Sequence, residues 1–454
     1  MNGKLSLDDL KRLIEKGEID TILPVFPDHY GRLLGKRLTA EYFLSGVEKG
    51  MLHNCNYLLT VDMDMNPIPG FAMASWDKGY GDFVSVMDMG TLRRIPWLPR
   101  TALVVCDLHW ENGEPVAQAP RSILREQCRR LHEAGLYANM GSELEFYLFK
   151  ESVSAVHERD YKNLHPSSDY RIDYHILHTS LDEPIIRAIR NGMSEAGVPI
   201  ECSKGEWGAG QHEIGLWYSE ALEMADRHVI YKNGVKEIAA LAGASATFMA
   251  KYDAAQAGSG FHIHTSLVHT KSGRNAFWDE KSHRPTPLFR QFLGGMLALS
   301  REFCLLFTPS LNAYKRYTED SFAPTRIAWA HDNRTTGYRI VGEGQSFRIE
   351  NRMPGADGNP YLAFAATLAA GLYGIEHQLD CGEPYEGNAY TATDLPKLPA
   401  TLKEATELFD KSEAARKLFG DDVVEHYVHA ARTEQAAFER AVTDWELRQY
   451  FDRI

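Results

Sequence analysis

The sequence predicts an α+β fold with a small amino-terminal unit and a large carboxy-terminal unit. Strand-like runs and helical patterns are interspersed without the regular alternation of a doubly wound sheet. A polar stretch with two prolines, residues 111–120, separates the short β-like runs before it from a helical pattern over residues 122–133. We therefore expect one unit over residues 1–112 and a second over residues 113–454, with no internal repeat.

The amino-terminal unit opens with a helical pattern over residues 5–16, which Gly17 is expected to end. An apolar run over residues 19–26, a turn over 28–31 and a second run over 32–38 predict a β-hairpin. Thr39 could cap another short helix that ends near Gly50. Further short β-like runs follow, and the last of them covers residues 102–108.

The carboxy-terminal unit combines strand patterns with long helices. Strands are expected over residues 143–149, 261–267 and 346–351, and the end of the chain from 402 to 451 is mostly helical in pattern. The nearly uncharged run over residues 358–375 reaches the lower limit of a membrane span. Because Asn359 is suited to an N-cap and Pro360 to the first turn, a buried helix is the better interpretation.

Composition and charge limit the possible functions. The chain has 454 residues, 49 Lys and Arg against 62 Asp and Glu, and a formal charge of −13, which argues against a nucleic-acid-binding protein. An anionic substrate remains possible if arginines are concentrated locally. The six cysteines show no CxxC spacing, so a disulfide framework or a thiolate zinc site is not expected. The amino terminus has no signal-peptide pattern, and we expect a cytoplasmic protein that does not contact a membrane.

Two short motifs place chemically active side chains on strands. Glu143 and Glu145 should share one face of their strand, where two like charges need a countercharge or a metal. An E-x-E motif alone is more often a solvated outer face. His262 and His264 repeat this spacing, and an H-x-H motif alone is more often a pair of hydrogen-bonded histidines than a metal site. These residues alone leave both interpretations open.

Further acidic and basic residues follow along the chain. Glu206 and Glu213 flank a glycine-containing turn, so their spacing alone decides nothing. Glu350 and Arg352 should share one face of a short strand. Three cationic segments, Lys315-Arg316, Asn333-Arg334 and Arg339, lie close to one another in sequence. A surface network of ion pairs and a local anion-binding site are equally good interpretations of these cations.

Taken together, these segments resemble the glutamine synthetase superfamily along essentially the whole chain. The turn with Gly31 and the residues 35–37 is similar to its amino-terminal β-grasp domain. Six segments match its catalytic motifs in order: 141–146, 210–213, 258–264, 312–316, 333–334 and 350–352. Six motifs in the right order form a specific signal, and the resemblance implies the glutamine synthetase fold, with a small β-grasp domain and a large catalytic α+β domain.

The resemblance implies a role for each motif. Two or more Mg²⁺ or Mn²⁺ ions per site would be held in two groups, one formed by Glu145, Glu206 and Glu213 and the other by Glu143, His262 and Glu350. Five carboxylates and two dications leave about one negative charge, so ATP and glutamate require arginines as well. Arg316 and Arg352 would hold glutamate, near Gly258 and Glu145. Arg334 and Arg339 would face the transferred phosphoryl group. The residues along ATP would be His264, Ser266 and Tyr218. For Tyr218, a buried core position is an equally good interpretation.

Two positions depart from the members of the family that use ammonium. Those members have an Asp in the segment that reads Asn54 to Leu59 here, and a flap Glu where this chain has Phe322. Ammonium prefers a cage of oxygens, whereas an organic amine needs room and apolar contact. We infer a larger primary amine as the acceptor, with Phe322 and Trp207 slightly favouring a monoamine over a polyamine. Alternatively, Glu319 or Asp320 takes the place of the flap Glu through a loop shift, which would leave ammonium as the substrate.

The sequence therefore predicts an ATP-dependent ligase. It would join the γ-carboxylate of L-glutamate to a primary amine through γ-glutamyl phosphate, and Glu206, Tyr174 or Glu319 could take the amine's proton. The alternatives are a glutamine synthetase that uses ammonium, a guanidino kinase, and a non-catalytic binding protein of the same family. The resemblance also implies a homo-oligomer, a dodecamer of two hexameric rings. It leaves open the amine, the preferred metal, the ring number and the regulation.

Overall fold

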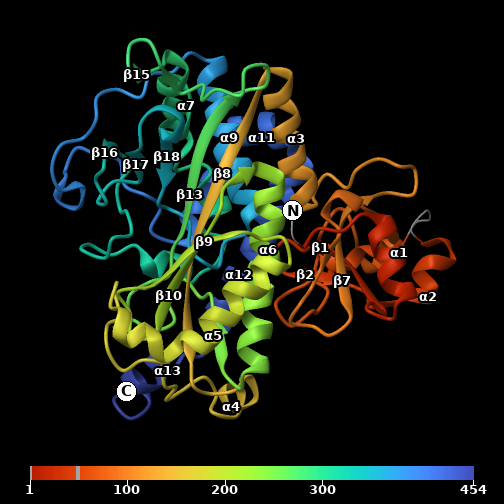
Figure 1. Ribbon diagram of the computed structural model, residues 1–454. Coiled ribbons are helices and arrows are strands. Elements are labelled where there is room, and N and C mark those ends of the chain that lie inside the picture. The colour runs from red at the N-terminus through yellow and green to blue at the C-terminus, as the bar shows by residue number, and fades with distance from the viewer. Residues whose placement is uncertain (1–2, 48–51) are drawn as a thin grey trace.

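The computed structural model describes residues 3–47 and 52–454 and contains two main sheets of unequal size (Figure 1). The smaller sheet has the order β2-β1-β7-β5-β4, with β3 beside β1 and β6 beside β7. Its strands are β1 (Thr21–Pro27), β2 (Leu33–Gly35), β3 (Leu38–Thr39), β4 (Leu52–Cys55), β5 (Asp82–Met87), β6 (Arg93–Arg94) and β7 (Thr101–His109). The predicted hairpin is confirmed, because β1 and β2 pair antiparallel with Val25 opposite Gly35.

The helices of this first part begin where side chains can cap them. In α1 (Leu7–Glu15), Ser6 and Asp9 form a capping box, and Leu10 is buried against the small sheet. The Thr39 hydroxyl accepts a hydrogen bond from the backbone N–H of Tyr42, so Thr39 caps α2 (Ala40–Tyr42) as predicted. The expected end of that helix near Gly50 lies outside the described residues.

The larger sheet has the order β16-β17-β18-β13-β8-β10-β9, with β11 and β12 also paired to β8. Its strands are β8 (Leu136–Phe149), β9 (Ile200–Gly205), β10 (Gln211–Leu216), β11 (Ser219–Glu220), β12 (Ser245–Thr247), β13 (Phe261–His269), β16 (Trp329–His331), β17 (Tyr338–Val341) and β18 (Arg348–Asn351); β14 (Trp278–Asp279) and β15 (Arg284–Pro285) form a separate ladder. The long β8 lies beside β13 through the middle of this part (Figure 1). The predicted strands all occur, although β8 begins seven residues earlier than expected.

The helices of this part contact strands of the larger sheet or pack on one another, and they continue to the end of the chain (Figure 1). They are α3 (Pro120–Glu133), α4 (Val153–Glu158), α5 (Ile176–Glu195), α6 (Ala221–Leu241), α7 (Pro287–Leu299), α8 (Cys304–Phe307), α9 (Pro360–Glu376), α10 (Leu402–Lys411), α11 (Glu413–Phe419), α12 (Asp421–Arg440) and α13 (Asp444–Tyr450). The α+β class is thus confirmed. The two sheets lie on either side of residues 112 and 113, where the domain boundary remains a prediction.

Helix α9 starts at the contact between the two parts of the chain. The side-chain oxygen of Asn359 accepts a hydrogen bond from the N–H of Tyr361 and so caps the helix, as predicted. The amide nitrogen of Asn359 donates to the carbonyls of Asp28 and His29, at 3.2 and 3.1 Å, in the hairpin turn of the small sheet. Most of α9 is buried, which agrees with a core helix. One buried amide therefore joins the start of this helix to the other sheet.

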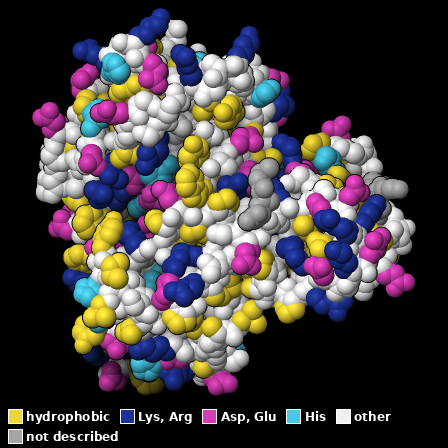
Figure 2. All heavy atoms as spheres, viewed as in Figure 1, with side chains coloured by type: hydrophobic (Ala, Val, Ile, Leu, Met, Phe, Trp, Pro, Cys, Tyr) yellow, Lys and Arg dark blue, Asp and Glu magenta, His cyan; other side chains and the backbone are white. Residues whose placement is uncertain are grey.

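Over the face shown in Figure 2, Lys and Arg side chains are intermingled with Asp and Glu rather than gathered by sign. Among the residues that the structure describes, none of the helices combines the length and the apolar character needed to cross a bilayer.

Candidate active site

Strand register brings the predicted acidic and histidine residues together on one face of the larger sheet. In the β8–β13 pair Glu143 lies opposite His262, and in the β8–β10 pair Glu145 lies opposite Glu213. Glu350 on β18 lies opposite His264. Because residues on alternate positions of a strand share a face, four neighbouring strands present these six side chains toward one region.

The alternation along β8 is the reason that both of its carboxylates point this way. Leu144 and Phe146 are fully buried in the core on the opposite side. Glu145 is buried as well, and both His262 and His264 are largely buried. The Glu143 side chain is 36% exposed, but the burial of Glu145 and both histidines shows that the E-x-E motif is not a solvated outer face.

The first group of side chains is formed by Glu145, Glu206 and Glu213. Their carboxylate oxygens lie within 4.8 Å of one another. Burial and the nearby charge of Glu206 raise the pKa of Glu145 to about 7. Burial and the charge of Glu143 raise the pKa of Glu213 well above its usual value. Three carboxylates held this close carry more negative charge than their protein neighbours neutralise, which suits a cation.

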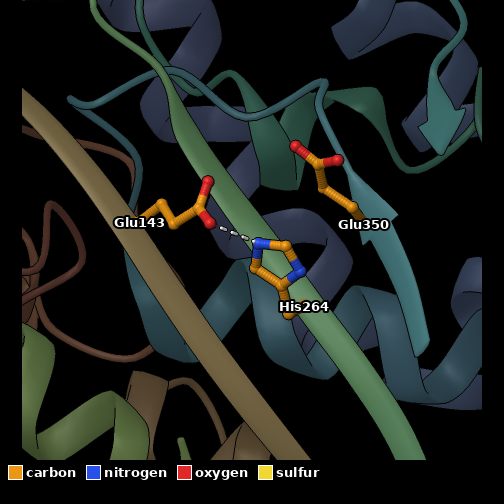
Figure 3. Close-up of side chains that lie close together, drawn as sticks. All are labelled: Glu143, His264 and Glu350. Atoms are coloured by element: carbon orange, nitrogen blue, oxygen red, sulfur yellow. Dashed lines mark ion pairs between the residues drawn. The ribbon is translucent and has the colours of Figure 1, made fainter. Parts of the chain in front are cut away.

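The second group contains Glu143, Glu350 and the two histidines. Glu143, His264 and Glu350 come from three adjacent strands and point toward one another (Figure 3), with Nε2 of His264 2.8 Å from a Glu143 oxygen. His262 lies between the same carboxylates, with its Nδ1 3.4 Å from Glu143 and 3.5 Å from Glu350. Burial raises the affinity of Glu143 for protons, but the two histidines outweigh it and hold the pKa of Glu143 well below its usual range.

The hydrogen bonds of His264 distinguish the two histidines. The Nε of Arg348 donates to Nδ1 of His264 at 3.1 Å, so Nδ1 must carry the lone pair and Nε2 the proton. A nitrogen that carries a proton cannot bind a metal. His262 faces both carboxylates through Nδ1, which therefore carries the proton in this structure; no described donor holds its other nitrogen, so the proton can move there and free Nδ1 for a metal. This geometry favours His262 over His264 as the nitrogen ligand of the second group.

Two arginines neutralise Glu350. Nη1 of Arg339 donates to one oxygen of Glu350 at 2.9 Å, and Nη1 of Arg352 donates to the other. Burial would raise the pKa of Glu350, but Arg352 and the two histidines together lower it to about 2. Arg352 is buried, and its Nε has no hydrogen-bond partner among the described residues. A buried guanidinium with a free donor is suited to an anionic ligand.

Arg316 lies on the same side of the site and packs against Gly258, where a larger residue would leave no room for the arginine side chain. It is buried and donates to the carbonyls of Met353 and Arg352, at 2.9 and 2.8 Å. A Cβ on Gly258 would meet the Arg316 side chain at 2.6 Å, so this residue must be glycine for the arginine to fit. Burial lowers the pKa of Arg316. The surface ion-pair interpretation is therefore wrong for Arg316.

The remaining predicted residues lie nearer the surface. Arg334 is exposed, and Ser266 is half-buried on β13. Tyr218 is 62% exposed, so its interpretation as a core tyrosine is wrong, while a contact with ATP remains a prediction. Phe322 is 54% exposed and has a φ of 59°, and its backbone carbonyl accepts a hydrogen bond from Arg352 at 3.2 Å. Asn54 is buried on β4 and donates to Ser85.

Sequence reasoning missed three residues that contact these groups. Lys204 on β9 contacts Glu206, and Gln211 donates to Glu145 at 3.1 Å and to the carbonyl of Gly258 at 3.0 Å. Arg348 orients His264, as described above. A signal existed for Lys204, because it lies only two residues before Glu206, which directly follows β9. Gln211 and Arg348 required knowledge of the strand register.

The donor set fits a divalent cation. Carboxylate oxygens with a single imidazole are the ligands that Mg²⁺ and Mn²⁺ prefer, and the absence of thiolates from both groups argues against softer metals. The first group offers only oxygens, and the second offers oxygens and one histidine nitrogen. The identity of the ion remains open between Mg²⁺ and Mn²⁺.

Comparisons with known proteins agree with this geometry. Residues 117–450 match the family model for the catalytic domain of glutamine synthetase. γ-Glutamylethanolamide synthetase GlnA4 from Streptomyces coelicolor is 50% identical, over 99% of this chain and 96% of that protein. Glutamate–isopropylamine ligase from a Pseudomonas species is 38% identical, over 100% of this chain and 99% of that protein. The solved GmaS/ADP complex superposes with a TM-score of 0.85 at 27% identity, over 98% and 99% of the two chains. The chain belongs to the glutamine synthetase family.

Proposed function

We propose that this chain is an ATP-dependent ligase that joins the γ-carboxylate of L-glutamate to a primary organic amine. The observation that carries this function is the contact between a dense group of carboxylates and a set of buried arginines on one sheet face. Cation-binding carboxylates and anion-binding guanidiniums are both needed where a nucleotide triphosphate meets a carboxylate substrate. Both relatives named above are ligases or synthetases of glutamate amides, which places this chain beside the γ-glutamylamide synthetases.

The reaction requires two transfers. In the first, an oxygen of the glutamate γ-carboxylate bonds to the γ-phosphorus of ATP, and the bond to the β–γ bridging oxygen breaks, which releases ADP. In the second, the amine nitrogen bonds to the γ-carboxyl carbon of γ-glutamyl phosphate and loses a proton, and the bond from that carbon to the phosphate oxygen breaks, which releases phosphate. Divalent cations, when bound, neutralise the phosphate oxygens and favour the departure of ADP.

The arginines have separate parts in this proposal. Arg316 and Arg352 hold glutamate, which is supported by the free Nε of Arg352 and by the close approach of Arg316 to Gly258. Arg339 and Arg334 stabilise the charge of the transferred phosphoryl group. The carboxylates Glu145, Glu206 and Glu213 hold one cation, and Glu143, His262 and Glu350 hold the second. His264, Ser266 and Tyr218 line the path of ATP.

The acceptor amine must lose a proton before it can attack. An amine with a pKa near 10.4 is about 3.4 units above pH 7, so its neutral form costs roughly 4.6 kcal/mol. Glu206, Tyr174 and Glu319 are the groups proposed to receive the proton. Phe322, with its exposed ring, lines the acceptor side of the site and favours an amine with an apolar portion.

The experiment that tests this function measures phosphate release that depends on both glutamate and ATP. Ethanolamine, isopropylamine, aniline, putrescine and ammonium are compared as acceptors with Mg²⁺ or Mn²⁺ present. We expect at least one organic amine to exceed ammonium in kcat/KM by tenfold or more. Activity with ammonium alone would instead identify a glutamine synthetase, and binding of ATP with no turnover would identify a non-catalytic family member.

The oligomer is a further part of the proposal. We propose a homo-oligomer, with the dodecamer of two hexameric rings that the resemblance implies, and mass photometry should then find particles of twelve 51.2-kDa chains. A single population at the mass of one chain would contradict it.

A further inference from the structure

Lys204 is placed where the first carboxylate group needs a positive charge. It lies on β9 directly opposite Glu213 on β10, and its ammonium contacts Glu206 and lies 4.0 Å from an oxygen of Glu213. Its side chain is only 20% exposed, similar to its two partners. The ammonium therefore takes up an oxygen that the group would otherwise offer to a divalent cation.

The ammonium of Lys204 has a second neighbour that is not charged. It lies 4.6 Å from the centre of the Tyr174 ring, within the range of a cation–π contact. The ring is held in this place by backbone, because the N–H of Tyr174 donates to the carbonyl of Gly205 at 3.2 Å, and Tyr174 has a φ of 55°. The same ammonium therefore contacts a carboxylate and the ring at once, and the ring contact uses no carboxylate oxygen.

The charges of the group account for both contacts. When all three carboxylates are ionised around a bound dication, the ammonium and the dication together neutralise them. The dication and the ammonium repel each other, however, and both require oxygens of Glu206. A lysine has a long flexible stem, so its ammonium can leave the carboxylate and keep its contact with the ring.

We propose that Lys204 is a built-in countercation that competes with the divalent cation for the group of Glu145, Glu206 and Glu213. In the metal-free chain its ammonium neutralises Glu206, and when a divalent cation binds, the ammonium withdraws to the ring of Tyr174. Lys204 thereby weakens and sets the affinity of this metal position while it stabilises the empty site. This inference rests on the metal-dependent function proposed above.

The test measures Mn²⁺ binding to the full-length protein without substrates. Mn²⁺ is titrated into the wild type, Lys204→Met and Lys204→Arg, and free Mn²⁺ is followed by electron paramagnetic resonance. We expect one of the two sites in Lys204→Met to bind Mn²⁺ tenfold or more tightly than in the wild type. The Mn²⁺ affinity of Lys204→Arg should stay within a few-fold of the wild-type affinity. Lys150→Met, at an exposed lysine beside Asp169, is the matched control and should leave both sites unchanged.

Thermal unfolding gives an independent readout. In EDTA, Lys204→Met should unfold at a lower temperature than the wild type, because three carboxylates lose their countercharge. Saturating Mn²⁺ should then raise the unfolding temperature of this variant by more than it raises that of the wild type. Equal or weaker Mn²⁺ binding by Lys204→Met would overturn the proposal, since a purely structural lysine would loosen the site when removed.

A second variant tests the proposed role of Lys204 if Lys204→Met does not fold. Tyr174→Leu removes the resting place of the ammonium and should weaken Mn²⁺ binding several-fold with no change in the unfolding temperature in EDTA. Unchanged Mn²⁺ binding by Tyr174→Leu would overturn the withdrawal onto the ring. A wild type that binds no Mn²⁺ would overturn the metal sites of the proposed function as well, so the two failures can be told apart.

Discussion

The two carboxylate groups of the site share one sheet face, but they are neutralised in different ways. Glu350 in the second group receives one hydrogen bond from each of two arginines, and its pKa is lowered to about 2. In the first group a lysine contacts Glu206, and burial with the charge of Glu206 raises the pKa of Glu145 to about 7, although Arg316 and Lys204 partly offset this. Fixed guanidiniums keep one group charged permanently, whereas the other group depends on a cation that can arrive or leave.

The largest effect on stability is expected when Arg339 and Arg352 lose Glu350, the carboxylate that both of them contact. Glu350→Gln leaves the guanidiniums of Arg339 and Arg352 close together without an anion, which should destabilise the fold by about 3–5 kcal/mol. Glu206→Gln in the first group should cost far less, because Lys204 can still reach Glu213 and Tyr174. Denaturant unfolding of both variants in EDTA measures this difference, and equal destabilisation would remove the distinction between the two groups.

The substitution at Glu350 in the second group should also lower the catalytic activity. Glu350→Gln should lower kcat by on the order of 10²–10³, because both a metal ligand and the anchor of two arginines are lost. Asp332→Asn is the matched control, since Asp332 is exposed and also accepts a hydrogen bond from Arg339, at 2.9 Å. It should stay within a few-fold of the wild type in a glutamate-dependent phosphate-release assay.

A smaller effect, on the choice of acceptor amine, is expected at Phe322, whose backbone carbonyl contacts Arg352. Phe322 holds Arg352 through its carbonyl, which every substitution keeps. Phe322→Glu should therefore leave the KM for glutamate unchanged, while it shifts the ratio of kcat/KM for ammonium to that for the preferred amine by about tenfold toward ammonium, a change of about 1.4 kcal/mol. Phe322→Gly relieves the positive φ without adding a carboxylate, and it should not shift this ratio toward ammonium.

Pattern and motif order predicted much of the site, and strand register explains the remainder. The alternation at Glu143 and Glu145 fixed their common face, and the Asn359-Pro360 pair located the start of α9, because both are local properties. Lys204 became a partner of Glu213 only through the pairing of β9 with β10. The contact of Phe322 with Arg352 depends on a loop with positive φ, which composition alone does not indicate.

The smallest effect on stability is expected at a third buried cluster, where none of the described carboxylates forms an ion pair with the histidines. The rings of His29 and His426 lie 6.1 Å apart between the hairpin turn and α12. Burial, with Arg32 nearby, lowers the pKa of His29 to about 3. Burial, with His29 and His429 nearby, lowers the pKa of His426 well below its usual value.

These lowered pKa values determine how the free energy of unfolding changes with pH. Between pH 3 and 6.5 the unfolded chain binds a proton at His29 that the folded chain does not, so stability falls as the pH falls below 6.5. From pH 7.5 to 5.5, His29 alone should lower the free energy of unfolding by about 1.4 kcal/mol. His29→Gln should remove that part of the slope, and His377→Gln, at an exposed position, should not. A slope unchanged in His29→Gln would show that this histidine is not held neutral.

The amide of Asn359 has a mechanical consequence for how the site can open. Two of its buried hydrogen bonds join the first turn of α9 to the hairpin of the other sheet, and a third caps the helix itself. A hinge that separated the two sheets here would break the two crossing bonds and leave a buried amide without its acceptors. We therefore expect substrates to enter by displacement of loops and side chains, and not by a swing of one lobe away from the other.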